Sequence, residues 1–369
     1  MIDRRLITNF DWPLFFLTII LSVIGVINLY STSQGVLNGN IYVKQIYWFI
    51  IGLLALFLIF CIDYRFFEKW GYLIYFLFFL LLLTVFFHGS IAYGAKRWLK
   101  FGGIRFQPSE LMKLAMIIAL GKYFHGQRND LKGEKKDGYR LRDLWVPFIL
   151  ALIPVMLILK QPDLGTAIIF LFIFISIIFY MRIRLSSFFI LCGIILFFVP
   201  IFWHFLKDYQ RSRILTFFNP SRDPLGLGYQ IIQSKIAVGS GGLWGKGFLH
   251  GTQSKLHFLP TQHTDFVFSV FSEEWGLIGS ILVLILFCLL IIWGLSIANQ
   301  SKDLFGKVVA FGITSMLFWQ VVINIGMATS LLPVVGVPLP FFSYGGSSTV
   351  TTLIAIGLLI NVKTRRFIF

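Results

Sequence analysis

Ten long apolar runs, each bounded by charged or polar residues, dominate the pattern of hydrophobic positions along this chain. A helix that crosses a bilayer needs about 20 predominantly apolar residues. The pattern therefore predicts an all-α polytopic membrane protein with about ten transmembrane helices, organised as a single integral membrane domain over residues 1–369. The predicted spans cover residues 12–30, 46–62, 71–87, 109–124, 144–159, 164–181, 186–206, 276–297, 308–326 and 347–362.

Composition excludes the other broad classes. The 369 residues are 57% hydrophobic and 13% charged, with a mean hydropathy of +0.82, whereas a soluble domain is close to half apolar and about a quarter charged. The net charge of +16 does not indicate nucleic acid, because so apolar a chain offers no basic soluble face. The three cysteines lie inside apolar runs, far apart, without the spacing of a metal site or disulfide framework.

The distribution of basic residues predicts the orientation. Ten spans place both termini on one side, and that side then carries 18 of the Lys and Arg residues, against 6 in the short loops of the other side. Cytoplasmic loops are enriched in Lys and Arg. We therefore expect both termini in the cytoplasm, with a large extracytoplasmic loop, about residues 207–264, between the seventh and eighth helices.

A second outer segment, residues 88–105, carries four basic residues against the usual bias, among them Arg97 and Arg105. An anionic ligand at the outer face explains this excess, and so does contact with lipid headgroups. The long loop adds Arg211 and Lys246 to the outer cations. Because Lys246 lies among five glycines, backbone N–H groups there could form a nest for phosphate. The spacing does not fit an ATP-binding loop.

Asp265 is the sharpest candidate for chemistry. It follows His263 and Thr264 where the long loop meets an apolar helix. Partial desolvation at this boundary raises the proton affinity of a carboxylate and suits a general base. An acid also simply favours the positive end of a helix dipole. Position alone leaves both interpretations open.

Helical spacing places Asp265, Ser269, Ser272 and Gly276 near one face, so an unbroken helix carries a polar stripe from the outer surface into the membrane. Acidic residues at membrane depth are costly and need a partner. For the neighbouring pair of glutamates, Glu273 and Glu274, we expect structural pairing with a basic residue of the loop.

Three further positions are candidates for the outer cavity or its floor. Glu110 and Lys113 have the i, i+3 spacing of a buried ion pair, for which a structural role is the default. Asp163 either caps the sixth helix or lines the cavity. Ser343 lies in a Pro- and Gly-rich segment, residues 326–348, which either lines a cavity as a re-entrant loop or merely packs the last two spans together.

The histidines and Asp265 match no tight metal site, and a dedicated zinc site is disfavoured. A hard divalent cation such as Mg²⁺ or Mn²⁺, shared between Asp265 and a phosphate ligand, is the cofactor that the residues favour. We expect no organic cofactor.

Several long motifs resemble the SEDS family (shape, elongation, division and sporulation), and the resemblance covers essentially the whole chain. Within this family the chain is most similar to the elongation branch, while the division branch differs at IIQSKIAVGSGG, GTQ and VVGVPLP. The matching strings are GAKRWLKFGGIRFQPSELMKLA, QPDLGTA, NPSRDPLGLGYQIIQSKIAVGSGGLWGKGFLHGTQ, FLPTQHTDFVFSVFSEEWG and LLPVVGVPLPFFSYGGSS.

The resemblance implies a peptidoglycan glycosyltransferase that polymerises lipid II, the undecaprenyl-diphosphate disaccharide-pentapeptide, at the outer face of the bacterial cytoplasmic (inner) membrane. It assigns the essential aspartate to Asp265, an intramembrane salt bridge to Glu110 and Lys113, and an important position to Asp163. One departure is visible: Thr261 stands where the family usually has Glu. Any role of that Glu is therefore not transferred.

The resemblance also implies an inverting single displacement that makes β-1,4 links, with Asp265 as general base, and a class B penicillin-binding protein as crosslinking partner beside other membrane proteins of the elongation complex. Two alternatives differ in class. A lipid II flippase would use the same cavity without chemistry, and a structural scaffold would tolerate loss of Asp265. The division branch would perform the same chemistry.

Overall fold

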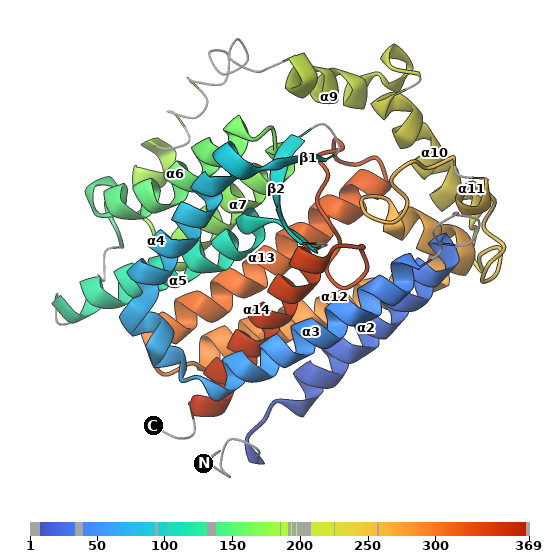
Figure 1. Cartoon of the computed structure of the whole chain (residues 1–369). Helices are drawn as coiled ribbons and strands as arrows, with labels where there is room; N and C mark the ends of the chain where they lie inside the picture. The colour runs from blue at the N-terminus through green and yellow to red at the C-terminus, as the bar shows by residue number, and fades with distance from the viewer. Residues whose placement is uncertain are drawn as a thin grey trace.

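The computed structural model describes residues 8–33, 40–92, 95–102, 104–130, 138–184, 186–190, 193, 197, 208–224, 226–256 and 258–366. Long helices form a bundle, and both chain termini lie at the same end of it, at the bottom of Figure 1. A small sheet and the helices α9 to α11 lie toward the opposite end, which we call the outer end.

The long helices of the bundle coincide with the predicted apolar runs. Nine of the ten runs fall on helices, and the tenth, residues 186–206, lies largely outside the described residues. Among the described residues, seven segments are long and apolar enough to cross a membrane, while α7 is shorter. The all-α polytopic prediction is confirmed. The helices are α2 (Trp12–Thr32), α3 (Ile41–Cys61), α4 (Tyr64–His88), α5 (Pro108–Asp130), α6 (Trp145–Lys160), α7 (Leu164–Tyr180), α12 (Val267–Gln300), α13 (Leu304–Ala328) and α14 (Gly346–Arg365).

Aspartates start several of these helices. The carboxylate of Asp163 accepts a hydrogen bond from the backbone N–H of Thr166 in α7, at 3.3 Å, and Asp303 accepts one from Gly306 in α13, at 2.9 Å. These bonds satisfy N–H groups that lack an intrahelical partner. Of the two roles considered for Asp163, the structure therefore contains the cap.

Close backbone approach joins the second and last long helices. A Cβ atom built on Gly357 of α14 would lie 2.9 Å from the carbonyl oxygen of Leu56 in α3, so the glycine is needed for this contact. In a membrane, helices associate through such small residues, because lipid removes the hydrophobic drive between them. The pair α3 and α14 thus forms one tightly packed side of the bundle.

The segment 88–105, which the sequence analysis treated as a loop, contains most of a small antiparallel sheet in its described part. Its strands follow in the order β1 (Ser90–Ala92), β2 (Ala95–Phe101) and β3 (Ile104–Phe106). Lys100 of β2 lies opposite Arg105 of β3, and both are exposed. The sheet leads directly into α5 and fixes the position of Arg97 on β2.

The long segment 207–264 also contains more regular structure than its composition predicted. It includes α9 (Asp208–Phe218), a 3₁₀ turn η2 (Pro220–Arg222), α10 (Leu227–Ser240) and α11 (Thr252–Lys255). In α10, the buried hydroxyl of Ser234 lies 2.7 Å from that of Ser269 and donates to the carbonyl of Ala328 at 2.6 Å. The helix α10 is therefore attached to both α12 and α13.

The helix after Asp265 is broken, so the condition for a continuous polar stripe is not met. Within α12 the backbone breaks at Gly276, which has φ 66° and ψ −163°. The loop 241–247 wraps this break: the N–H of Leu277 donates to the carbonyl of Gly242 at 2.9 Å, and that of Gly247 to the carbonyl of Glu274 at 3.0 Å. The polar residues before Gly276 therefore belong to a short outer segment, not to a stripe down the apolar helix that follows.

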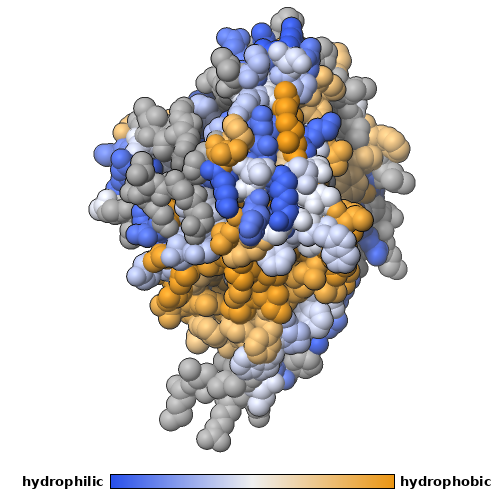
Figure 2. Space-filling view, turned by 90° about the vertical axis from the view of Figure 1, so that its right-hand side faces the viewer, coloured by the Kyte–Doolittle hydropathy of each residue, from blue (hydrophilic) through white to orange (hydrophobic). Residues whose placement is uncertain are grey.

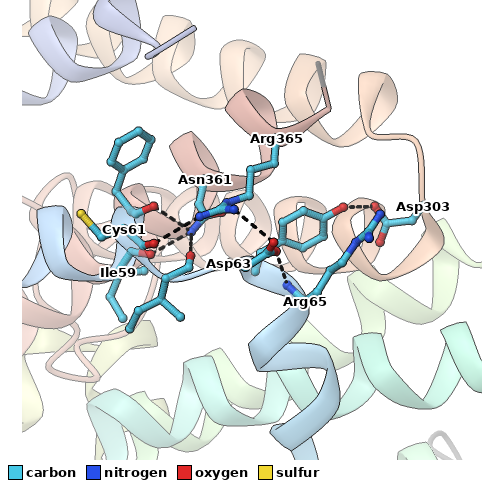
Figure 3. A network of polar contacts seen from close by, with 10 residues as sticks. Ile59, Cys61, Asp63, Arg65, Asp303, Asn361 and Arg365 are labelled. Carbon is cyan, nitrogen blue, oxygen red and sulfur yellow. Dashed lines mark hydrogen bonds and ion pairs between the residues drawn. The ribbon is translucent and has the colours of Figure 1, made fainter. Parts of the chain in front are cut away.

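The end of the bundle that holds the termini is tied together by polar contacts of α14 (Figure 3). The guanidinium of Arg365 lies 3.1 Å from the carboxylate of Asp63. The amide of Asn361 donates to the carbonyl oxygen of Ile59, at 2.8 Å. These contacts fix the end of α14 against the turn between α3 and α4.

The surface agrees with a membrane location. On the face shown in Figure 2, hydrophobic residues gather in a band, with most of the hydrophilic residues above it. Large apolar side chains on the spans are exposed, including Leu54, Leu58 and Ile292 at more than 60% each. A contiguous apolar surface of this kind is covered by lipid.

Candidate active site

Asp265 lies in the turn that precedes α12, at the outer end of the bundle. Its backbone N–H donates to the carbonyl of Thr261 at 3.1 Å, and its own carbonyl accepts from the side-chain amide of Asn324 at 3.0 Å. Thr261, which replaces the family's usual Glu, thus contributes a backbone carbonyl that any residue supplies. The hydrogen bond that forms this turn therefore does not depend on the side chain at position 261.

The surroundings of the Asp265 carboxylate combine burial with positive charge. Burial raises the pKa of this carboxyl above its ordinary value, Arg97 and Arg213 act in the opposite direction, and Asp163 adds to the rise. As a whole, the residue is half-buried. A carboxylate with raised proton affinity has the properties of a general base.

Asp163 connects Arg97 to the bundle. Its carboxylate lies 3.4 Å from the guanidinium of Arg97 and accepts hydrogen bonds from Gln107 at 3.0 Å and from the hydroxyl of Thr166 at 2.9 Å. The side chain of Asp163 is 2% exposed and that of Arg97 is 23% exposed. The buried acid therefore holds a partly exposed cation near Asp265.

The segment 326–348 forms a wall against the turn that carries Asp265. The hydroxyl of Ser343 donates to the carbonyl of Thr264 and accepts from the N–H of Leu339. The N–H of Tyr344 donates to the carbonyl of His263 at 2.8 Å. Ser343 is buried, so its hydroxyl joins two backbone segments. His263 contributes through its backbone, while its ring contacts Thr32 at 3.0 Å.

Lys246 does not lie open in a nest. Its ammonium group forms an ion pair with Glu273 at 2.6 Å, and the Glu273 carboxylate also accepts from the backbone N–H and hydroxyl of Thr252. The expected pairing of a glutamate with a loop base is thus present for Glu273. Glu274 instead accepts a hydrogen bond from the hydroxyl of Ser31.

Glu110 and Lys113 meet as their spacing predicted. The ammonium group of Lys113 lies 2.8 and 2.9 Å from the two carboxylate oxygens of Glu110, and both residues are almost fully buried. Such a pair is costly to build and costly to break. The predicted contact is confirmed, and its burial fits a structural role within the bundle.

The remaining predicted cations occupy other elements. Arg105 is exposed on β3, and Arg211 is partly buried on α9. Sequence reasoning missed Arg213 on the same helix, although it acts on Asp265. It also missed Gln107 and Asn324, since an amide in or beside an apolar helix gives no sequence signal for the contact that it makes.

The donor set fits a divalent cation only in part. Asp265 and Asp163 offer carboxylate oxygens, and the described part of the chain contains no group of three or more His, Cys, Asp or Glu residues that could enclose a metal ion. A Mg²⁺ or Mn²⁺ ion in this place would therefore take its remaining ligands from the diphosphate of a substrate.

With this geometry in view, comparisons with known proteins decide the family. The chain matches the model of the FtsW/RodA/SpoVE family, described as cell cycle proteins, over residues 10–367. The chain belongs to this family. The SEDS resemblance is confirmed, and the match extends over all helices of the bundle.

Individual relatives agree. The chain is 41% identical to the peptidoglycan glycosyltransferase MrdB of Escherichia coli over 86% of this chain and 84% of that protein. It resembles a solved structure described as "Structural coordination of polymerization and crosslinking by a peptidoglycan synthase complex", with a TM-score of 0.81 and 36% identity, covering 97% and 98% of the two chains. For the rod shape determining protein RodA of Thermus thermophilus the TM-score is 0.71, with 30% identity and the same coverage. The expectation of a peptidoglycan glycosyltransferase in the membrane is confirmed.

Proposed function

We propose that this glycosyltransferase polymerises lipid II into β-1,4 glycan strands during cell-wall elongation, with Asp265 as the general base. The observation that carries this proposal is the Asp265 carboxyl, whose pKa is raised by burial against the opposing charges of Arg97 and Arg213. A base and two cations together match a sugar transfer that releases a diphosphate.

In the proposed step, Asp265 accepts the proton of the acceptor sugar's 4-hydroxyl group while that oxygen attacks the anomeric carbon of the donor. The new glycosidic C–O bond forms on the face opposite to the leaving group. The bond to the diphosphate breaks, and its electron pair leaves with the diphosphate. The configuration is inverted in a single displacement. Arg97 and Arg213 stabilise the negative charge on the leaving oxygens.

A class B penicillin-binding protein is the partner that we propose. The structural relative described as a peptidoglycan synthase complex coordinates polymerisation with crosslinking, and this supports the pairing. The similarity to MrdB and RodA supports the elongation branch, together with other membrane proteins of the elongation complex as further partners.

We also propose that the site faces the outside of the cytoplasmic membrane, with both termini in the cytoplasm. The excess of Lys and Arg at the cytoplasmic loops supports this orientation, as does the common location of the two termini at one end of the bundle (Figure 1). Lipid II and the diphosphate product then remain in the outer leaflet.

The test is polymerisation of purified lipid II, read as glycan ladders on a gel. The wild-type chain and Asp265→Ala are each paired with a class B partner whose transpeptidase serine is replaced, with divalent cation present. Ladders from wild type alone, with equal folding of the variant by thermal unfolding, support the proposal. Ladders from both proteins would remove Asp265 as the base. Absence of ladders from both, with lipid II transfer across vesicle membranes, would favour the flippase.

A further inference from the structure

Two buried asparagines bind the backbone at Asp265 and two residues after it. Asn324 of α13 donates to the carbonyl oxygen of Asp265 at 3.0 Å, and Asn28 of α2 donates to the carbonyl oxygen of Val267 at 2.9 Å. Both asparagines are 0% exposed. Each amide therefore acts on the main chain, from a helix distant in sequence.

Asn324 uses its second amide hydrogen to reach the opposing wall. It donates to the carbonyl oxygen of Val337 at 2.8 Å. The preceding residue, Gly336, lies beside the Asp265 carboxylate: a Cβ atom built on it would be 3.5 Å from Oδ2. The Asn324 side chain thus links the turn that carries Asp265 to the segment that contains Gly336 and Val337.

These amides are retained at a cost. The side-chain oxygens of Asn28 and Asn324 are buried and have no hydrogen-bond partner, so the loss of their hydration is not compensated. A leucine of similar size would fill either site without that cost. The benefit of the amides must therefore lie in the contacts made by their nitrogens, which are directed at the backbone next to Asp265.

We propose that Asn324 and Asn28 are positioning residues, which hold the backbone of residues 265–267 so that the Asp265 carboxylate points at the acceptor hydroxyl. The proposal rests on the proposed role of Asp265. It assigns neither asparagine a contact with substrate. A reacting group displaced by about 1 Å loses on the order of 10²-fold in rate, so loosening this backbone lowers the chemical rate and leaves the cations that bind the donor in place.

The experiment measures kcat and KM for lipid II polymerisation by the full chain with its class B partner. Asn324→Leu lowers kcat at least 10-fold and changes KM less than 2-fold, and Asn28→Leu acts in the same direction. Asn324→Ser keeps one donor and gives an intermediate kcat. The matched control is Asn361→Leu, because Asn361 is also 0% exposed and also donates to backbone carbonyls, at the opposite end of the bundle (Figure 3).

Each outcome decides the matter. An equal loss of kcat in Asn324→Leu and Asn361→Leu, per folded protein, would reduce the asparagines to general stabilisers and overturn the proposal. If Asn324→Leu does not fold, Asn324→Ser and Asn28→Leu carry the same comparison. Asp265→Asn runs in parallel: an active Asp265→Asn overturns the proposed base, whereas an inactive one beside wild-type kcat in both asparagine variants overturns only the positioning role.

Discussion

The guanidinium of Arg97 lies 3.4 Å from the carboxylate of Asp163 and close enough to Asp265 to lower its proton affinity. Arg97 belongs to β2 and Asp163 to the turn before α7, so their contact joins the sheet to the bundle. Arg97 thus interacts with two acids, by an ion pair with Asp163 and by its charge with Asp265. The loss of this cation therefore has a defined electrostatic result.

Replacing Arg97 by glutamine raises the pKa of Asp265 further, because the positive charge that opposes burial is removed. A base works only when ionised, so the acid limb of the rate–pH profile shifts to higher pH. The measurement is kcat for lipid II polymerisation from pH 5 to 9. Lys100→Gln is the control, since Lys100 is an exposed cation on the same strand. An unshifted acid limb in Arg97→Gln would contradict the claim that the charge of Arg97 lowers the pKa of the catalytic base.

Asp265→Asn abolishes polymerisation and yet stabilises the fold. The folded-state pKa of Asp265 is raised, so folding favours the proton-bound form, and stability is lost as pH rises from the ordinary carboxyl pKa through the raised one. At neutral pH the amide removes this cost. We expect the unfolding temperature of the variant to rise at pH 7.5 and to rise less at pH 4. Asp208→Asn, at an exposed site, should leave it unchanged. A lower unfolding temperature for Asp265→Asn would contradict the pKa direction.

Lys246→Met tests whether this lysine binds phosphate or supports the loop. Its partner Glu273 is 0% exposed and keeps hydrogen bonds to Thr252 after the substitution. We expect a loss of about 1–3 kcal/mol in stability and a KM for lipid II within 2-fold of wild type. Lys255→Met is the control at an exposed lysine of the same loop. A large rise in KM with unchanged stability would instead indicate that Lys246 binds the substrate.

Gly276→Ala destabilises the protein, because the φ of 66° disfavours any Cβ and the added atom would lie 2.3 Å from the backbone nitrogen of Gly245. We expect at least about 2 kcal/mol from strain and displacement of the loop, measured by thermal unfolding. Gly239→Ala is the matched control, since a Cβ there meets nothing within 4 Å. Equal effects of the two substitutions would show that the break at Gly276 carries no special constraint.

Features that depend on local spacing were predictable from the sequence. The apolar runs identified the long helices, and the i, i+3 interval between Glu110 and Lys113 identified their ion pair. The resemblance singled out Asp265, and the structure provides an environment for it that suits a base. These features need no knowledge of the tertiary arrangement.

Features that depend on distant contacts were not predictable. In the sequence, Asn28 and Asn324 are isolated amides in apolar helices. Only the tertiary structure shows that they donate to the backbone carbonyls of Val267 and Asp265. The glycines around Lys246 suggested a phosphate nest, whereas they allow the loop to close over the break at Gly276. The strands β1 to β3 are short and lack a clear alternation, so the segment around Arg97 resembled a loop.

The break at Gly276 also bears on how the protein enters the membrane. Residues 277–300, which follow the break, contain no charged side chain, whereas Glu273 and Glu274 precede it. An ionised side chain at the centre of a bilayer costs about 2.5–3.5 kcal/mol during insertion by the translocon. With the break in place, the two acids precede the segment that enters the lipid. Membrane insertion of this helix therefore requires the transfer of no charged side chain into the bilayer.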